Sequence, residues 1–219
     1  MWCIGNITAE YRARMDELLA LYTRPYRAQE PVVCVDEKSK QLLQQLRPAL
    51  AARPGRIAKE DYEYHRAGTR SIFLAVEPKG LHREVAVTVR RTKPDFVGFV
   101  QRLVEEVYAQ ARKIHIVLDN LNTPFRASFV EVLGGRVAHR LLRWVQFHYT
   151  PKHASWLNMA EIEIGIMERQ CTNQRIGTEA LLRSGVTQWQ RRRNRAACGI
   201  KWKFTRQDAD RKLSRHYVT

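Results

Sequence analysis

Short runs of consecutive apolar residues recur along the chain, and their lengths fit buried β-strands. Residues 31–36 and 113–119 are two such runs, and each ends in an aspartate. Apolar and polar positions alternate only weakly in them, which is typical of parallel strands covered by helices on both faces. Residues 71–76 and 84–89, separated by a Pro-Lys-Gly turn, are predicted to form an antiparallel hairpin, and residues 145–149 alternate like a further strand.

Apolar residues at helical spacing mark several of the remaining segments. A proline and an aspartate begin the segment after the hairpin, and both residues favour a first helical turn. Residues from 37 to about 69 are polar, so we expect an irregular segment there, with a turn at the Pro-Gly between residues 53 and 56. The predicted helices are 8–22 with Thr8 as its cap, 94–112, 125–133, and a helix from Ser155 to Glu168 that Ser155 caps.

The aspartates that end the two buried runs are the first candidates for chemistry. The helix predicted at 94–112 lies between the strands at 84–89 and 113–119, and a crossover of this length makes those two strands parallel. If the two runs are neighbours, Asp36 and Asp119 emerge together at the carboxyl edge of the sheet, where open α/β folds place their sites. Two carboxylates at close range repel each other, so such a pair usually holds a proton or a cation.

The charge of the chain indicates a polyanionic partner. Its 219 residues include 38 Lys and Arg against 22 Asp and Glu, so the formal net charge is +16. No lipidation signal, signal peptide or apolar run of about 18 residues accompanies this charge, so we expect nucleic acid, not a membrane, as the partner of a cytoplasmic protein. The four cysteines lie far apart without a Cys-x-x-Cys pair, which predicts reduced thiols and no zinc ribbon.

The positive charge is concentrated toward the C-terminal end. From residue 183 to residue 219, eleven Lys or Arg stand against two Asp, so this segment carries nine of the sixteen net charges. A concentrated excess of this kind favours contact with a nucleic-acid backbone over a merely solvated surface.

Three blocks, in this order along the chain, carry a family resemblance. They are residues 34–38 (CVDEK), residues 117–123 (VLDNLNT) and residues 149–161, which end in Asn-x-x-Glu. Together they resemble the catalytic blocks of bacterial insertion-sequence transposases of the "six-thirty" group, in the mariner superfamily, over residues from about 30 to 219. The resemblance implies an α/β chain with a ribonuclease H-like fold, in which helices flank a mixed five-stranded sheet.

The resemblance also assigns a chemistry to the acids. In that family the Asp, Asp and Glu of the three blocks hold two Mg²⁺ ions, for which Mn²⁺ can substitute, and they map onto Asp36, Asp119 and Glu161. Hard oxygen ligands suit Mg²⁺, and a pair of such ions can activate water or a 3′-hydroxyl for DNA strand cleavage and strand transfer. Helical position does not decide whether Glu161, Glu163 or Glu168 is the third acid. The choice of Glu161 therefore depends on the Asn-x-x-Glu motif. No small-molecule cofactor is implied.

The partner that the resemblance implies is DNA, as transposon ends and as target, with a homodimer and association with the bacterial nucleoid as further expectations. Relatives carry helix-turn-helix modules before the catalytic domain, and this chain starts too late to contain them. Specific recognition of transposon ends is therefore not expected of this polypeptide alone. The expected DNA contacts are Arg53, Arg56, Lys152, His153, Arg191, Arg192, Arg193 and Arg195.

We interpret residues 1–30 as a helical linker, residues 31–182 as the catalytic domain and residues 183–219 as its basic helical extension. Two other functions fit the same residues. One is a different nuclease on the same fold, distinguished by whether DNA 3′-ends are joined to a target. The other is a basic nucleic-acid-binding remnant or regulator without catalysis, and the fold alone does not decide among the three.

Overall fold

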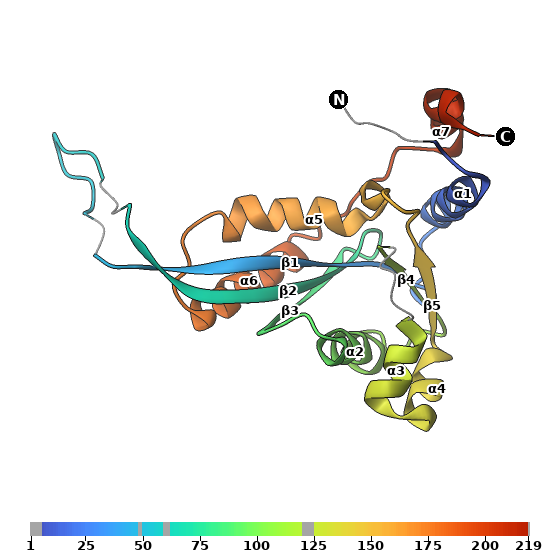
Figure 1. Cartoon of the computed structure of the whole chain (residues 1–219), viewed down its shortest axis with the longest axis horizontal. Coiled ribbons are helices and arrows are strands. Elements are labelled where there is room, and N and C mark those ends of the chain that lie inside the picture. The colour runs from blue at the N-terminus through green and yellow to red at the C-terminus, as the bar shows by residue number, and fades with distance from the viewer. Residues whose placement is uncertain (1–5, 48–49, 59–61, 120–124, 219) are drawn as a thin grey trace.

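The computed structural model describes residues 6–47, 50–58, 62–119 and 125–218. A five-stranded sheet in the order β3-β2-β1-β4-β5 lies at its centre, with helices on both faces (Figure 1). The predicted α/β class and mixed five-stranded sheet are confirmed. The strands are β1 (Val32–Gln45), β2 (Tyr64–Glu77), β3 (His82–Thr88), β4 (Ile114–Leu118) and β5 (Val145–Tyr149).

The sheet combines antiparallel and parallel pairing. β1 pairs antiparallel with β2, and β2 pairs antiparallel with β3, so the predicted hairpin is confirmed. β4 lies between β1 and β5 and is parallel to both, as the crossover predicts. β3 and β5 are therefore the edge strands, and the carboxyl ends of β4 and β5 meet at one end of the sheet.

β1 and β2 extend far beyond the rest of the sheet as a two-stranded arm (Figure 1). The prediction of an irregular segment over residues 37–69 is wrong for residues 37–45 and 64–69, because the two strands continue until Gln45 lies opposite Tyr64. Much of the arm is exposed to solvent, so its strands need no alternating apolar pattern. The predicted turn is confirmed at the tip, where Arg53 and Arg56 exchange backbone hydrogen bonds of 3.0 and 2.8 Å.

Helices cover both faces of the sheet, each over a separate hydrophobic core (Figure 1). α2, α3 and α4 pack on the face to which Val33 and Val35 point, and α5 and α6 pack on the face to which Cys34 points. The helices are α1 (Ala9–Thr23), α2 (Lys93–Arg102), α3 (Phe125–Leu133), α4 (Gly135–Leu142), α5 (Met159–Met167), α6 (Glu179–Arg195) and α7 (Arg206–Leu213).

The first two helices follow the predictions at their starts. Thr8 caps α1, and its side chain accepts a hydrogen bond from the backbone N of Tyr11 at 3.2 Å. At the start of α2, Asp95 accepts hydrogen bonds from the backbone and side chain of Thr92. The predicted end of this helix at residue 112 is wrong, because α2 passes into a π-helical turn at Leu103–Val107 and the helical structure stops there.

Two later helices differ from the predictions. Ser155 begins only a short 3-10 turn, and Asn158 caps α5 instead, because its side chain accepts a hydrogen bond from the backbone N of Ala160. α4 was not predicted, since paired glycines after a helix usually mark an end. Here Gly134, at a φ of 76°, turns the chain directly into a second helix.

The two terminal segments of the described chain pack together. Ile7 forms a parallel bridge with Tyr217, and Arg12 pairs with Asp210 at 2.9 Å. Exposed ion pairs of this kind contribute little to stability. Apolar side chains of α1 and α7, including Leu213, belong to the same core as α5 and α6, so burial holds the predicted linker and the basic extension against the sheet.

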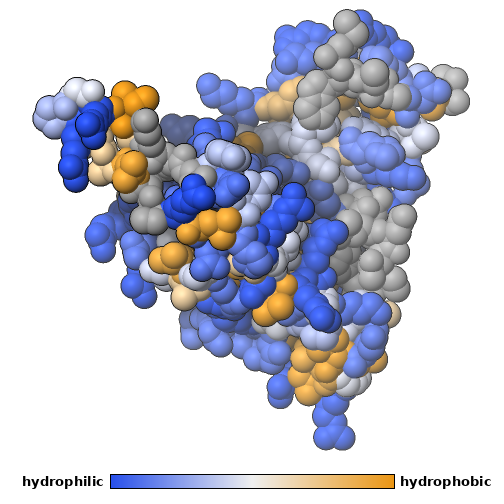
Figure 2. Space-filling model, turned by 60° about the vertical axis from the view of Figure 1, so that its left-hand side comes forward, coloured by the Kyte–Doolittle hydropathy of each residue, from blue (hydrophilic) through white to orange (hydrophobic). Residues whose placement is uncertain are grey.

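On the face that Figure 2 shows, most of the coloured side chains are hydrophilic, and hydrophobic ones form small separate groups among them. Within the described part of the chain, none of the helices has both the length and the apolar composition needed to span a bilayer. Cys34, Cys171 and Cys198 are free thiols, as predicted, and Cys3 lies outside the described residues.

Candidate active site

Asp36 and Asp119 lie at the point where the parallel pairing of β1 and β4 stops. The last paired residues are Cys34 and Val117, and each aspartate follows two positions later. Because side chains alternate between faces, both aspartates lie on the α5 side of the sheet, as Cys34 and Val117 do. The expected juxtaposition is present, but Asp36 does not end its strand: β1 continues into the arm, and only its neighbour β4 ends here.

Asn158 connects these two strands to α5. Its side-chain nitrogen donates to the backbone O of Val35 at 3.0 Å and to Oδ1 of Asp119 at 3.2 Å. Its side-chain oxygen accepts from the backbone N of Ala160, so one fully buried amide caps the helix and positions an aspartate. The Asn-x-x-Glu motif contains this residue, but the sequence reasoning used the motif only to select the glutamate.

Glu161 and Glu163 occupy very different places on α5. Glu161 lies in the first turn and is exposed, on the side of the helix near Asp119. Glu163 is fully buried and receives two hydrogen bonds each from Arg83 and Arg193, at 2.9 and 3.2 Å. Burial acts to raise the pKa of Glu163, but these guanidinium groups lower it below its usual value. Glu163 is therefore a structural anion, and Glu161 remains the candidate third acid.

The electrostatics of the site show that the three acids lie within range of one another. Burial raises the pKa of Asp36 from 3.8 to about 7, and the carboxylates of Asp119 and Glu161 act in the same direction. A backbone hydrogen bond of 2.7 Å from Glu37 opposes this rise. Partial burial and then Asp119 raise the pKa of Glu161, while Lys38 acts to lower it. A proton or a cation would relieve this repulsion.

The donor set suits a hard divalent cation, because all three groups present carboxylate oxygens. Among the described residues, no three His, Cys, Asp or Glu side chains lie close enough together to hold one ion as they stand. Asp36, Asp119 and Glu161 thus interact through space without forming a closed set of ligands. Residues 120–123 of the second sequence block lie outside the described residues.

Comparison with known proteins identifies the family. The DDE superfamily endonuclease family matches residues 31–183, which include both aspartates and Glu161. The chain belongs to this family. No curated protein sequence matches the chain.

Solved structures of Mos1 transposase complexes align with the chain at low sequence identity. The Mos1 mariner paired end complex with Mn aligns with a TM-score of 0.52 and 13% identity, over 90% of this chain and 61% of that one. The Mos1 transposase paired-end complex with left transposon end aligns with a TM-score of 0.48 and 14% identity, over 86% and 57%. The first likeness confirms the ribonuclease H-like fold, and the chain spans about 61% of that protein's length.

The predicted DNA contacts fall into separate regions of the chain. Arg53 and Arg56 lie at the tip of the arm, far from the acids (Figure 1). Lys152 and His153 lie in the exposed loop after β5, where His153 adopts a φ of 63°, unusual for a residue with a side chain. In α6, the exposed arginines at the C-terminal end are Arg191, Arg192 and Arg195.

Arg193 does not share the exposure of its neighbours. Its side chain is only 14% exposed, and its guanidinium group is bonded to the buried Glu163. The interpretation of Arg193 as a DNA contact is therefore corrected: it neutralises a buried carboxylate and joins α6 to α5. Charge counting could not separate it from Arg191, Arg192 and Arg195, because the four lie within five positions of sequence.

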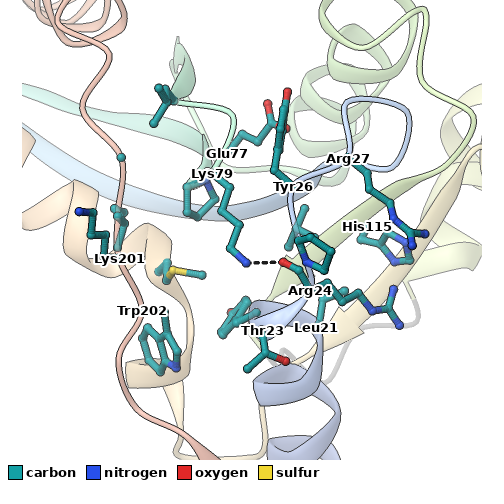
Figure 3. Close-up of a pocket in the computed structure, with 18 of the residues that line it drawn as sticks. Leu21, Thr23, Arg24, Tyr26, Arg27, Glu77, Lys79, His115, Lys201 and Trp202 are labelled. Carbon is teal, nitrogen blue, oxygen red and sulfur yellow. Dashed lines mark hydrogen bonds between the residues drawn. The ribbon is translucent and has the colours of Figure 1, made fainter.

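A hollow of about 680 Å³ lies beside the beginnings of β1 and β4 (Figure 3). Val32 and His115, an opposed pair on β1 and β4, contribute to its lining. They precede the two aspartates by four positions, so the acids lie roughly 13 Å away at about 3.3 Å per residue. Lys79 donates to the backbone O of Arg24 across this hollow, and Trp202 lines the other side.

A hydrogen-bonded chain connects this hollow to the surface. Nδ1 of His115 lies 2.9 Å from Nε2 of His148, and Nδ1 of His148 lies 2.6 Å from Oε1 of Glu17. Burial and the neighbouring His148 lower the pKa of His115 to about 4, so it is neutral at physiological pH. Sequence reasoning missed this chain, since the contact between the two histidines depends on the pairing of β4 with β5 and Glu17 comes from a distant helix.

Proposed function

We propose that the chain is the catalytic domain of a mariner-like transposase, which cleaves and joins DNA strands using divalent cations held by Asp36, Asp119 and Glu161. The observation that carries this proposal is the convergence of three carboxyl groups from two parallel strands and a helix at one end of a ribonuclease H-like sheet. The family match and the likeness to a mariner complex that contains Mn support it.

The residues of the chain would act as follows. Asp36, Asp119 and Glu161 would hold Mg²⁺ or Mn²⁺, and two such ions are the expected number. When bound, the cations would activate water or a 3′-hydroxyl and neutralise charge on the attacked phosphate. Binding requires the ionised form of Asp36, so cation and proton compete there. Asn158 would keep Asp119 in place while Glu161, free on the helix surface, closes the ligand set.

DNA contact is proposed for the exposed cations around this centre. Lys152 and His153 lie in the loop that follows β5. Arg191, Arg192 and Arg195 end α6, and their proposed role is to contact phosphate groups without reading sequence. Arg53 and Arg56 would contact DNA only beyond the body of the protein, because they lie at the tip of the arm.

The decisive experiment separates joining from cleavage. Supercoiled plasmid DNA is incubated with the protein and Mg²⁺ or Mn²⁺, and nicking is measured. A labelled oligonucleotide with a free 3′-hydroxyl is then offered as donor, and its joining to the plasmid is measured. We expect both activities, and we expect Asp119→Asn to abolish both.

The matched control is Glu37→Gln, which removes a carboxylate that neighbours the site and pairs with Arg91 at 2.8 Å. It should retain both activities. Nicking without joining would assign the chain to another nuclease class. DNA binding with neither activity, in either cation, would favour a non-catalytic DNA-binding protein and contradict the proposal.

A further inference from the structure

We propose that DNA runs along the outer side of β5, in a groove between this edge strand and helices α3 and α4. This inference rests on the proposed function and names a surface through which DNA would reach the acids. The groove, called here the edge groove, has a volume of about 700 Å³. The side chains that carry the argument are Lys113, Arg126, His139, Arg143, Phe147 and Tyr149.

The lining of the edge groove suits a nucleic-acid strand. Lys113, Arg126, His139 and Arg143 are basic residues, and among the described residues that line the groove none is acidic. Two aromatic residues of β5 lie between these cations, which is the combination that contacts phosphate and sugar or base together. Arg126 and Arg143 are exposed, so their charges are available to a partner in solution, and the side chain of His139 is exposed as well.

The charges of the edge groove are not neutralised within the described part of the chain, where neither Arg126 nor Arg143 makes an ion pair. The C-terminal segment differs, although it contains more cations. Arg206 pairs with Asp16 at 2.9 Å, and Arg183 and Arg211 are likewise paired with acids. Counterion release by a polyanion depends on cations that are free to replace its counterions. The edge groove offers such cations, whereas some of the cations in the C-terminal segment are already paired with acids.

The end of the edge groove at Tyr149 lies on the side of the sheet where the acids are. β5 has five residues, so the groove beside it is roughly 17 Å long, or about five phosphates at 3.4 Å per phosphate of one strand. Tyr149, at the carboxyl end of β5, pairs with Leu118, the residue before Asp119. Lys152 and His153 follow in the next loop. A DNA strand that leaves the groove at Tyr149 therefore crosses the end of the sheet beside Lys152 and reaches Asp119.

An edge strand could instead receive a β-strand from another protein. The basic side chains that flank β5 do not favour a second copy of this chain, since its net charge is +16. They favour a partner with closely spaced negative charge, and DNA is the partner that the proposed function already requires.

The test is the salt dependence of DNA binding with Arg126→Gln and Arg143→Gln combined. Fluorescence anisotropy of a short labelled duplex is measured in EDTA, so the result does not depend on cations or catalysis. Two lost phosphate contacts should reduce the slope of log affinity against log salt by about 1.8. Between about 50 and 200 mM salt, the loss of affinity should then be roughly tenfold smaller than for the unaltered protein.

The matched control combines Arg14→Gln with Arg211→Gln, which removes the same charge from α1 and α7, away from the groove. Its slope should stay close to that of the unaltered protein. A photo-crosslinking side chain in place of Gln146 should also capture the DNA, and one in place of Arg14 should not.

Equal slopes for the groove variant and the unaltered protein, or no crosslink from position 146, would overturn the edge groove while leaving nicking and joining intact. Absence of nicking by the unaltered protein, together with a reduced slope in the groove variant and a crosslink from position 146, would contradict the proposed function and leave the groove standing. Capture of a protein strand in place of DNA at position 146 would also overturn the groove assignment.

Discussion

Replacing Asp36 with Asn is expected to make the metal-free protein more stable at neutral pH. Burial, Asp119 and Glu161 raise the pKa of Asp36 from 3.8 to about 7, so the folded protein binds this proton more tightly than the unfolded chain does. The stability that this proton provides is fully present below the unfolded pKa of about 3.9 and is lost as the pH rises to about 7. Above that pH, folding must bury an ionised carboxylate, whereas the amide carries no charge.

The magnitude follows from the pKa of Asp36. A rise from 3.8 to about 7 corresponds to about 4 kcal/mol, at about 1.4 kcal/mol per pH unit. Water reaches part of this carboxyl group, and Asp119 and Glu161 share the interaction, so about half of that energy, ~2 kcal/mol, is expected. For a chain of 219 residues, this raises Tm by roughly 4–8 °C.

The assay is thermal unfolding in EDTA from about pH 4 to pH 8, where the proton of Asp36 is lost. The difference in Tm between Asp36→Asn and the unaltered protein should be smallest at pH 4 and largest at pH 8. Glu37→Gln removes the same charge from the next residue, on the other face of β1, and should not raise Tm. Added Mg²⁺ should stabilise the unaltered protein more than Asp36→Asn, since ligand binding favours the folded state. A Tm difference that does not change with pH, or an equal rise in both variants, would refute the reasoning.

Three further predictions concern neighbouring groups. Glu163→Gln should lower the unfolding free energy by about 3–5 kcal/mol, because it leaves buried guanidinium charge uncompensated, and Glu161→Gln should hardly change it in the same urea titration. Asn158→Ala should cost about 2 kcal/mol and weaken Mn²⁺ binding in calorimetry, because Asp119 loses its hydrogen bond; unchanged Mn²⁺ affinity would count against a positioning role. Three arginines are exposed at the end of α6, namely Arg191, Arg192 and Arg195. Replacing all three with Gln should lower the slope of log DNA affinity against log salt by about 2.7, whereas Arg193→Gln should mainly lower stability.

The placement of the two aspartates could be predicted from the sequence because it depends on local pattern and handedness. Apolar runs identify the strands, and the crossover helix makes β4 parallel to β3. β1 has the same direction as β3 because both pair antiparallel with β2, so β1 and β4 are parallel neighbours that bring Asp36 and Asp119 to one end of the sheet. Their common face then follows from alternation, which the pairing of Cys34 with Val117 confirms.

The remaining features depend on contacts between distant segments. Glu163 could not be separated from Glu161 by periodicity, because the difference lies in Arg83, which reaches Glu163 from β3 and is itself fully buried. The buried role of Arg193 was hidden for the same reason. The strands of the arm carry polar residues because little packs on them, so a pattern that detects burial cannot detect these strands.

The continuity of β1 has a mechanical consequence. Asp36 lies within the strand, and the same backbone runs on for nine residues to Gln45, a length of roughly 30 Å at about 3.3 Å per residue. A β-ribbon resists stretching but twists readily. A partner bound at the far end of the arm is therefore connected through β1 to Asp36, one acid of the proposed centre. A torque applied there would rotate Asp36 relative to Asp119, which lies just beyond the end of β4.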